Sequence, residues 1–426
     1  MKKKLYNLGF LLCFIILFCQ SLFAGARRED MKINQMEEKD MGVDLEFNTN
    51  PVHNQAKETS TFSENLFADK LNSYMPLDKN YMFSPLSIKI ALAMAANGAE
   101  GETKEQILKA LDIENIEDFN NTCKKMIENL PYSDIQKLNI ANSLWINKSR
   151  TNNNFSQSFT QLLTQFFKAE AQTVDNSNAV AIINNWVSKN TNDKIKAIIN
   201  DSNFEALLVN AIYFKGAWQK EFNEMATKPE IFYNADGTET TTDFMNQTGY
   251  FSYTSTDKTQ IIELPYKRNP SSDDFETSMY ILLPNQGVEL SVLQDLEDAI
   301  STEKLNRTFV RFSMPKFKIE YSTLLNKTLE SIGITRAFSN QAQLEPMFQS
   351  NQQIPSFSQV LHKTYITVDE KGTEAAAVTA IGLATSSLPP KPITLTLDKP
   401  FYFVIRDNNS GETLFIGRHA FAEKMN

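Results

Sequence analysis

Few side chains in this chain could carry out covalent chemistry. Three histidines, His53, His362 and His419, and three cysteines are the natural candidates for a nucleophile, a base or a metal ligand. There is no Gly-x-Ser-x-Gly turn, glycine-rich phosphate loop, His-x-x-x-His pair or paired cysteine motif. Cys123 is expected to be an isolated surface or half-buried thiol, and His362 a hydrogen-bonded core histidine. The sequence therefore predicts no enzyme, no metal site and no cofactor.

The strongest functional signal is the stretch "EKGTEAAAVTAIGLATSSLPPKP", residues 370–392. Taking every second residue from Thr373 selects only uncharged side chains: Thr373, Ala375, Ala377, Thr379, Ile381, Leu383 and Thr385. A strand that enters an existing sheet needs this pattern, because a charge on its inner face would be buried without a partner. Gly372 lies where the backbone must turn, and "LPPKP" keeps the far end extended. We interpret the stretch as an exposed loop that can become a strand; the alternative is a flexible linker.

The N-terminus has the features of a secretory signal. Lys2, Lys3 and Lys4 precede the apolar segment "GFLLCFIILFC", and Ala24-Gly25-Ala26 fits a cleavage site. Residues 1–26 are therefore predicted to be a signal peptide, with an uncleaved anchor as the alternative, and 27–58 a flexible polar leader. The mature protein is expected to be secreted and free of the membrane. Asn-x-Ser/Thr triplets, such as those at Asn147 and Asn246, are candidate glycosylation sites.

Composition and pattern favour one large domain. The chain has 426 residues, 42% of them hydrophobic, and a formal charge of −9, so it can bury a large core, and its acidity argues against nucleic acid as a partner. Helical patterns come mostly first, including a helix after Ser84-Pro85 that ends near Gly98 and another with Thr103-x-x-Gln106 as its capping box. Strand patterns come mostly later. We predict an α+β fold over residues 59–426, with large antiparallel sheets.

Several segments resemble the serpin family, in the family's order. They are "NYMFSPLSIKIALAMAANGAEGET", "LLVNAIYFKGAW", "FSMPKFKIEY", "VLHKTYITVDEKGTEAA" and "DKPFYFVIRDNNSGETLFIGR". The resemblance implies a dominant central sheet of mixed or antiparallel strands, further sheets, about eight or nine helices and an exposed reactive-centre loop at about 370–392. It also implies that a serine protease cleaves this loop and is trapped as an acyl-enzyme when the loop inserts into the central sheet.

The resemblance also assigns roles to individual residues. The loop hinge is matched by Gly372, Thr373, Glu374, Ala375, Ala376 and Ala377. The breach, where insertion begins, is matched by Glu370, Lys316 and Trp218. The shutter, a polar network beneath the strands that must part, is matched by Ser84, Ser87, Asn210 and His362.

Family spacing from Gly372 places the scissile bond between Ser386 and Ser387, with Leu383, Ala384 and Thr385 in front of it. This small, uncharged bait suits elastase-like or subtilisin-like proteases and lacks the cation that trypsin-like enzymes require. In a shifted register, Leu383 would suit a chymotrypsin-like enzyme. A papain-like target and a non-inhibitory carrier or chaperone are the alternatives, although the hinge keeps the small residues of inhibitory members. The protein is expected to be a monomer.

Overall fold

The computed structural model describes residues 66–131, 133–268, 276–289, 296, 299–300, 304–349, 355–373 and 391–423. These residues all belong to one compact unit of the chain, Lys57–Asn426. The predicted signal peptide and leader lie outside the described residues, as do the hinge after Thr373 and the whole bait segment.

Eight α-helices are described, and local signals explain where several of them begin. Ser84 caps the second of these helices, since its hydroxyl accepts a hydrogen bond from the Ser87 amide at 3.1 Å, and Gly98 follows the last turn, as predicted. The helices are α2 Leu66–Ser73, α3 Pro85–Asn97, α4 Gly101–Ala110, α5 Ile116–Asn129, α6 Lys148–Thr151, α7 Gln157–Phe167, α8 Ala179–Asn190 and α10 Asn326–Ser331.

The predicted capping box at Thr103 is wrong. Helix α4 begins at Gly101, so that Thr103 already lies in its first turn. The Thr103 hydroxyl accepts a hydrogen bond from the Gln343 amide at 3.0 Å, and the Gln106 side chain accepts one from the Arg336 amide at 2.8 Å. Both side chains bind a distant segment instead of capping their own helix, which a local pattern does not reveal.

Nine strands form the larger sheet, in the order β1-β15-β14-β8-β7-β6-β9-β13, with β5 paired to β6. All its pairs are antiparallel except β13 with β9. The strands are β1 Tyr81–Phe83, β5 Lys228–Tyr233, β6 Glu239–Ser255, β7 Thr259–Pro265, β8 Thr277–Pro284, β9 Asn306–Pro315, β13 Ile393–Thr396, β14 Phe401–Asp407 and β15 Thr413–His419.

Six strands form the second sheet, which is mixed and has the order β10-β11-β12-β4-β2-β3. They are β2 Gln136–Asn147, β3 Glu170–Val174, β4 Ala206–Ala217, β10 Phe317–Leu324, β11 Phe357–Asp369 and β12 Gly372–Thr373. As the apolar run predicted, β4 is a buried central strand. The α+β fold is thus confirmed, with two mixed sheets of which the larger is antiparallel except for one pair of strands.

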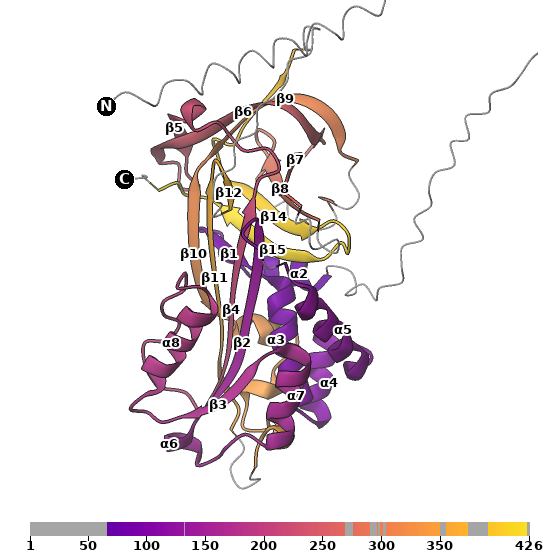
Figure 1. Cartoon of the computed structure of the whole chain (residues 1–426), viewed down its shortest axis with the longest axis vertical. Helices are drawn as coiled ribbons and strands as arrows, with labels where there is room; N and C mark the ends of the chain where they lie inside the picture. Colours follow the sequence, from indigo (N-terminus) through magenta and orange to yellow (C-terminus); the bar gives the residue numbers. More distant parts are fainter. Residues whose placement is uncertain are drawn as a thin grey trace, which may run out of the picture. The chain divides into compact units, whose positions relative to one another are not determined.

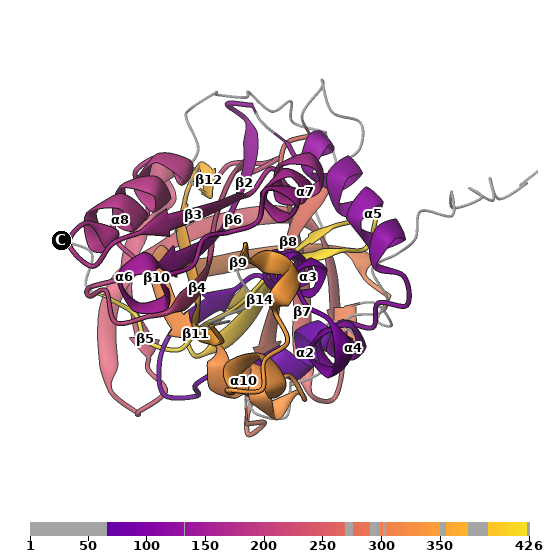
Figure 2. The ribbon, with the colours of Figure 1, turned by 90° about the horizontal axis from the view of Figure 1, so that it is seen from below.

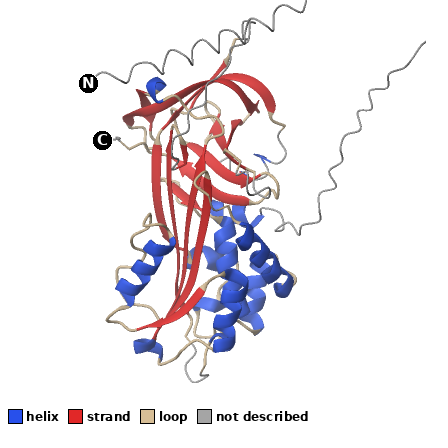
Figure 3. Ribbon diagram, viewed as in Figure 1, coloured by secondary structure: helices blue, strands red, loops and turns tan. Residues whose placement is uncertain are grey.

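Hydrophobic side chains cover both faces of this second sheet. On one face, Ile183 and Val187 of α8 pack with Leu207 and Val209 of β4. On the other face, alternate residues of β4 join the large core that contains α3. Figure 1 shows α8 on one side of the long strands and α3, α4, α5 and α7 on the other, and Figure 2 looks along the same strands. The helices gather toward one end of these strands, and the other end is mainly β-structure (Figure 3).

Candidate functional site

Strands β4 and β11 pair directly along most of their length and separate at one end. They run parallel and pair from Phe357–Ala206 to Tyr365–Tyr213. Beyond Tyr365 the two-residue strand β12 lies between them, antiparallel to both, with Thr373 opposite Val368 of β11 and Gly216 of β4. The sheet therefore has an opening between two neighbouring strands, and the first residues of the predicted hinge occupy its start.

A tight turn leads the chain from β11 into this opening. The Asp369 carboxylate accepts hydrogen bonds from the backbone amides of Lys371, at 2.9 Å, and Gly372, at 3.3 Å. Gly372 has a φ of +149°, and a Cβ atom there would lie 2.1 Å from the carbonyl oxygen of Gly216. The position consequently requires glycine for both its backbone conformation and its close contact with β4.

Thr373 is fully buried, and its hydroxyl lies 2.8 Å from the Tyr266 hydroxyl. The Tyr266 ring stacks on Trp218, with 4.6 Å between ring centroids and 14° between ring planes. Trp218 in turn donates its indole N–H to the carbonyl oxygen of Asp369 at 2.9 Å. Trp218, the tryptophan assigned to the breach, thus contacts both the backbone of the turn and the tyrosine ring.

Glu370 and Lys316, the pair assigned to the breach, form an ion pair of 3.0 Å. The Glu370 side chain is 8% exposed, and its other carboxylate oxygen accepts a hydrogen bond of 2.7 Å from the Thr227 hydroxyl. Burial alone would raise the pKa of Glu370, but the hydrogen bond from Thr227, backbone hydrogen bonding and the Lys316 ammonium together lower it below its usual value. Glu370 is therefore charged at neutral pH and fastens the turn to the segment before β10.

The four residues assigned to the shutter form one buried network below the opening. His362 of β11 and Asn210 of β4 are register partners, and their side chains are hydrogen-bonded. The Asn210 amide donates to the Ser87 carbonyl at 3.1 Å and to the Ser87 hydroxyl. The His362 Nε2 atom accepts the Ser84 amide at 3.1 Å. The network therefore ties β11 to β4, and both strands to the N-terminus of α3.

The hydrogen bonds identify the protonation state of His362. Because Nε2 accepts a backbone N–H, the proton of the neutral ring lies on Nδ1 and is donated to the side-chain oxygen of Asn210. Burial lowers the pKa of His362 from 6.5 to about 3. His362 is thus a neutral structural residue at physiological pH, in agreement with its predicted role as a hydrogen-bonded core histidine.

His419 is a second buried neutral histidine. It lies among aromatic rings, with centroid distances of 4.9 Å to Phe317, 5.0 Å to Phe232 and 5.3 Å to Phe401. Neither ring nitrogen has a hydrogen-bond partner among the described residues. Burial lowers its pKa to about 3 as well.

We expect the stability of the protein to fall steeply in mild acid. Both histidine pKa values lie lower in the folded chain, so below pH 6.5 the unfolded chain binds protons that the folded chain does not. Between the pKa of the unfolded chain, 6.5, and that of the folded chain, about 3, each histidine should lower the free energy of unfolding by about 1.4 kcal/mol for each unit by which the pH falls. Urea midpoints measured from pH 7.5 to 4.5 test this, and His419→Phe should remove about half of the slope. An unchanged slope in that variant would show that another group causes the pH dependence.

The structure adds residues that sequence analysis did not single out. Asn142 of β2 accepts a hydrogen bond from the Asn210 amide and extends the shutter to a third strand. Thr227, Tyr266 and Asp369 hold the turn before the opening. Of these, Asp369 alone carried a local signal, because an acidic residue three positions before a glycine is typical of a side-chain-capped turn.

Two sequence expectations need correction. Cys123 is fully buried, so that it is not a surface or half-buried thiol, and burial raises its pKa well above the usual value. Asn147 is fully buried too, and its amide donates to the Asn176 side chain at 2.7 Å and to the Ser202 carbonyl at 2.9 Å. A glycan on Asn147 is therefore incompatible with the folded chain. Asn246 is half-buried, and its amide also donates to backbone carbonyls.

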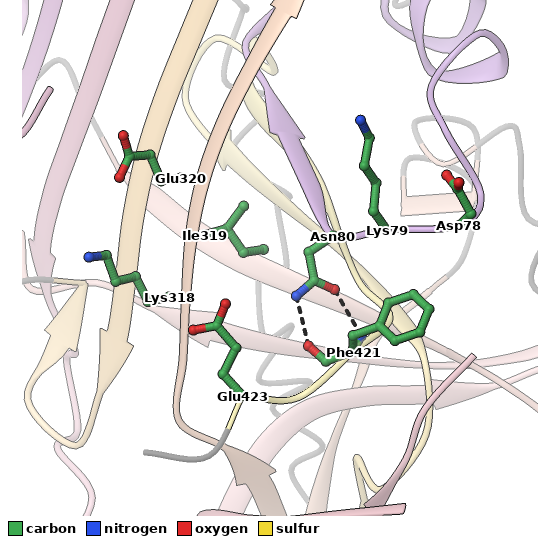
Figure 4. A pocket seen from close by; sticks show the side chains of 8 residues that line it. All are labelled: Asp78, Lys79, Asn80, Lys318, Ile319, Glu320, Phe421 and Glu423. Atoms are coloured by element: carbon green, nitrogen blue, oxygen red, sulfur yellow. Dashed lines mark hydrogen bonds between the residues drawn. The ribbon is translucent and has the colours of Figure 1, made fainter. Parts of the chain in front are cut away.

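The other features of the described residues offer no alternative site. A pocket of about 370 Å³ lies beside β10, and its lining includes exposed charges such as Asp78, Lys318 and Glu423 (Figure 4). Its half-buried Asn80 already bonds to the backbone of Phe421. Within the described ranges there is no cluster of residues that could hold a metal ion, and no helix long and apolar enough to span a membrane.

Comparisons with known proteins agree on one family. A sequence model described as "Serpin (serine protease inhibitor)" matches residues 57–420. Serpin-Z2A of Triticum aestivum is 35% identical over 361 residues, covering 79% of this chain and 89% of the relative. Neuroserpin of Homo sapiens is 32% identical over 396 residues, covering 86% and 93%.

Solved structures agree with the sequence comparisons. The thermophilic serpin tengpin, in its native state, is 31% identical, with a TM-score of 0.77 over 92% of this chain and 98% of that chain. Human thyroxine-binding globulin, solved in complex with thyroxine, is 24% identical, with a TM-score of 0.74 over 84% of this chain and 97% of that chain. That last likeness shows that the fold also occurs in a protein that carries a ligand.

Proposed function

The chain belongs to the serpin family, and on that premise we propose that it inhibits serine proteases as a suicide substrate. Members of this family are in general protease inhibitors, and some are non-inhibitory. In the proposed reaction the protease serine attacks the Ser386 carbonyl carbon and the peptide bond to Ser387 breaks. Ser387 leaves as a new amino terminus, and Ser386 remains esterified to the protease. Insertion of the loop between β4 and β11 then traps this ester before water hydrolyses it.

The observation that carries the proposal is the position of β12. Two hinge residues already lie between β4 and β11, and β12 is antiparallel to both. A longer strand added in the same direction would replace one parallel contact with two antiparallel pairs. β4 has 12 residues and β11 has 13, and Thr373 to Thr385 is also 13 residues. The space that would form if β4 and β11 parted along their length, and the segment whose alternate residues are uncharged, are therefore similar in length.

The register of β12 also fits the polarity of the segment. Thr373 pairs with Gly216 and Val368, so continuing both antiparallel registers would place Thr379 opposite both Asn210 and His362. These two residues lose their mutual hydrogen bond when the strands part, and a hydroxyl between them could bond to both. The same count would place Ala375 and Ile381 among apolar neighbours, Phe214 and Leu208 of β4.

The bait sequence supports a target class. Ser386, Thr385 and Ala384 are small and uncharged, which suits the permissive primary pocket of an elastase-like or subtilisin-like enzyme. We further propose that the chain is secreted, because its first 26 residues have the charge and length pattern of a signal peptide. It would act as a monomer in the extracellular space.

A protease panel tests the proposal. The mature chain is mixed with elastase, subtilisin, chymotrypsin, trypsin and a papain-like enzyme, and the products are separated on denaturing gels. A denaturant-stable complex, with a released peptide that begins at Ser387, is the expected result with elastase or subtilisin. If chymotrypsin forms the stable complex and the released peptide begins at Ala384, the scissile bond follows Leu383 and not Ser386. Cleavage by every enzyme without any complex would favour a non-inhibitory serpin and contradict the proposal.

A further inference from the structure

Tyr266 is held rigidly beneath the hinge. It follows β7, is 4% exposed and forms an isolated bridge with Trp218. Its ring stacks on Trp218 at 4.6 Å and meets the edge of Phe214 at 5.0 Å. These aromatic contacts restrict the ring from two directions and so hold its hydroxyl in one position beside the hinge.

The Tyr266 hydroxyl lies within hydrogen-bond distance of the Thr373 hydroxyl. The two oxygen atoms are 2.8 Å apart, and both residues are buried. Burial raises the pKa of Tyr266 well above its usual value, so the phenol keeps its proton and can donate. Thr373 is also the last described residue of the hinge, at the point where an inserting strand would begin to extend.

We propose that Tyr266 is a positioning residue for loop insertion, and that its hydroxyl selects a hydroxyl-bearing side chain at position 373. This inference rests on the proposed inhibitory function and deepens it. The first contact of a new strand is the least favourable one, because chain entropy is lost before neighbouring hydrogen bonds are gained. With Thr373 held in place, insertion extends an existing two-residue strand and does not have to nucleate a new one.

The apolar surroundings make this hydrogen bond selective. Phe214 and Trp218 pack on the Tyr266 ring, and both Tyr266 and Thr373 are buried, so a hydroxyl that loses its partner there is kept from water and remains unpaired. When both partners are replaced by apolar groups of the same shape, no unpaired hydroxyl remains and the loss is small. Removing one hydroxyl should therefore impair insertion, and removing both should restore it. A purely steric role for Tyr266 would not produce this restoration.

The test uses Thr373→Val, Tyr266→Phe and the double variant. Each is titrated against the protease that forms the stable complex with the natural protein. Each single variant should slow insertion about tenfold relative to hydrolysis of the acyl-enzyme, since one buried hydroxyl loses its partner. The number of inhibitor molecules consumed per trapped protease should rise accordingly. The double variant should return to within about twofold of the natural protein, and Thr373→Ser, which keeps the hydroxyl, is the matched control.

Amide hydrogen exchange gives a second readout that needs no protease. The Trp218 amide donates to the Lys371 carbonyl at 2.9 Å and reports on the turn. Exchange at Trp218 and Thr373 should accelerate in both single variants and slow again in the double variant. Single variants without effect in either measurement, or a double variant as impaired as the sum of the two, would overturn the inference. If no protease forms a complex but the double variant restores slow exchange, the contact between Tyr266 and Thr373 is supported and the proposed inhibitory function is contradicted.

Discussion

Replacing Thr373 with arginine should convert the protein from an inhibitor into a substrate. Thr373 is fully buried between β4 and β11, and its side chain faces Tyr266. A guanidinium there would be buried against the Tyr266 side chain, and burying a charge in place of a neutral hydroxyl costs about 3 kcal/mol or more. The hinge should leave the opening, and the acyl-enzyme should be hydrolysed before insertion begins.

The expected size of this effect is large. About 3 kcal/mol on the insertion barrier corresponds to about a hundredfold slower step, so nearly every encounter should end in a cleaved loop and a free protease. Denaturing gels would show cleavage without complex. Glu374→Arg is the control, because the alternation of the segment places that position on the opposite face. If Thr373→Arg trapped protease at an undiminished stoichiometry, insertion would not start where we propose.

Asn210→Ala should greatly shorten the lifetime of the native state. Asn210 links β4 to His362 on β11, to Asn142 on β2 and to Ser87 on α3. Its removal leaves several buried polar groups without this partner, at a combined cost of about 3 kcal/mol after partial relaxation. The hydrogen bond between Asn210 and His362 must break when β4 separates from β11, so the barrier to opening should fall with the stability.

Two measurements check this result. The rate at which inhibitory activity is lost at 37 °C should rise about a hundredfold, the rate equivalent of about 3 kcal/mol. Native gels should show self-associated species, because an opened sheet exposes unpaired strand edges. Asn121→Ala, at an exposed position on α5, is the matched control and should behave like the natural protein. An unchanged lifetime for Asn210→Ala would mean that the shutter does not limit opening.

Sequence patterns predicted much of the site because its elements have local causes. The Ser84-Pro85 start and the Gly98 end of α3 follow from hydrogen bonds within a few residues. The residues of β4 are mostly apolar because both faces of that strand are covered by other side chains. The resemblance to serpins then paired Glu370 with Lys316 and placed His362 and Asn210 in one cluster, and the structure shows an ion pair in the first case and a hydrogen bond in the second.

The errors share a different cause. Thr103 and Gln106 match a capping box, yet they bind residues more than 200 positions away. Asn147 matches a glycosylation triplet, but its amide is used inside the fold. In each case the sequence contains the motif, but the side chains instead form hydrogen bonds with residues from another part of the fold. Local patterns carry no information about which distant segment lies alongside.

By itself, the sequence determined that the chain forms a large α+β domain, belongs to the serpin family and carries a segment, residues 373–385, whose alternate side chains from Thr373 are uncharged. Those properties depend on residue type and on periods of two or 3.6 residues. Only the tertiary structure decided that Thr373 already lies between β4 and β11, that Tyr266 meets it and that Asn142 completes the shutter. Such contacts depend on strand order and register, which bring together residues as far apart as Asn142 and Asn210, 68 positions, or Tyr266 and Thr373, 107 positions, and are set by the packing of the whole domain.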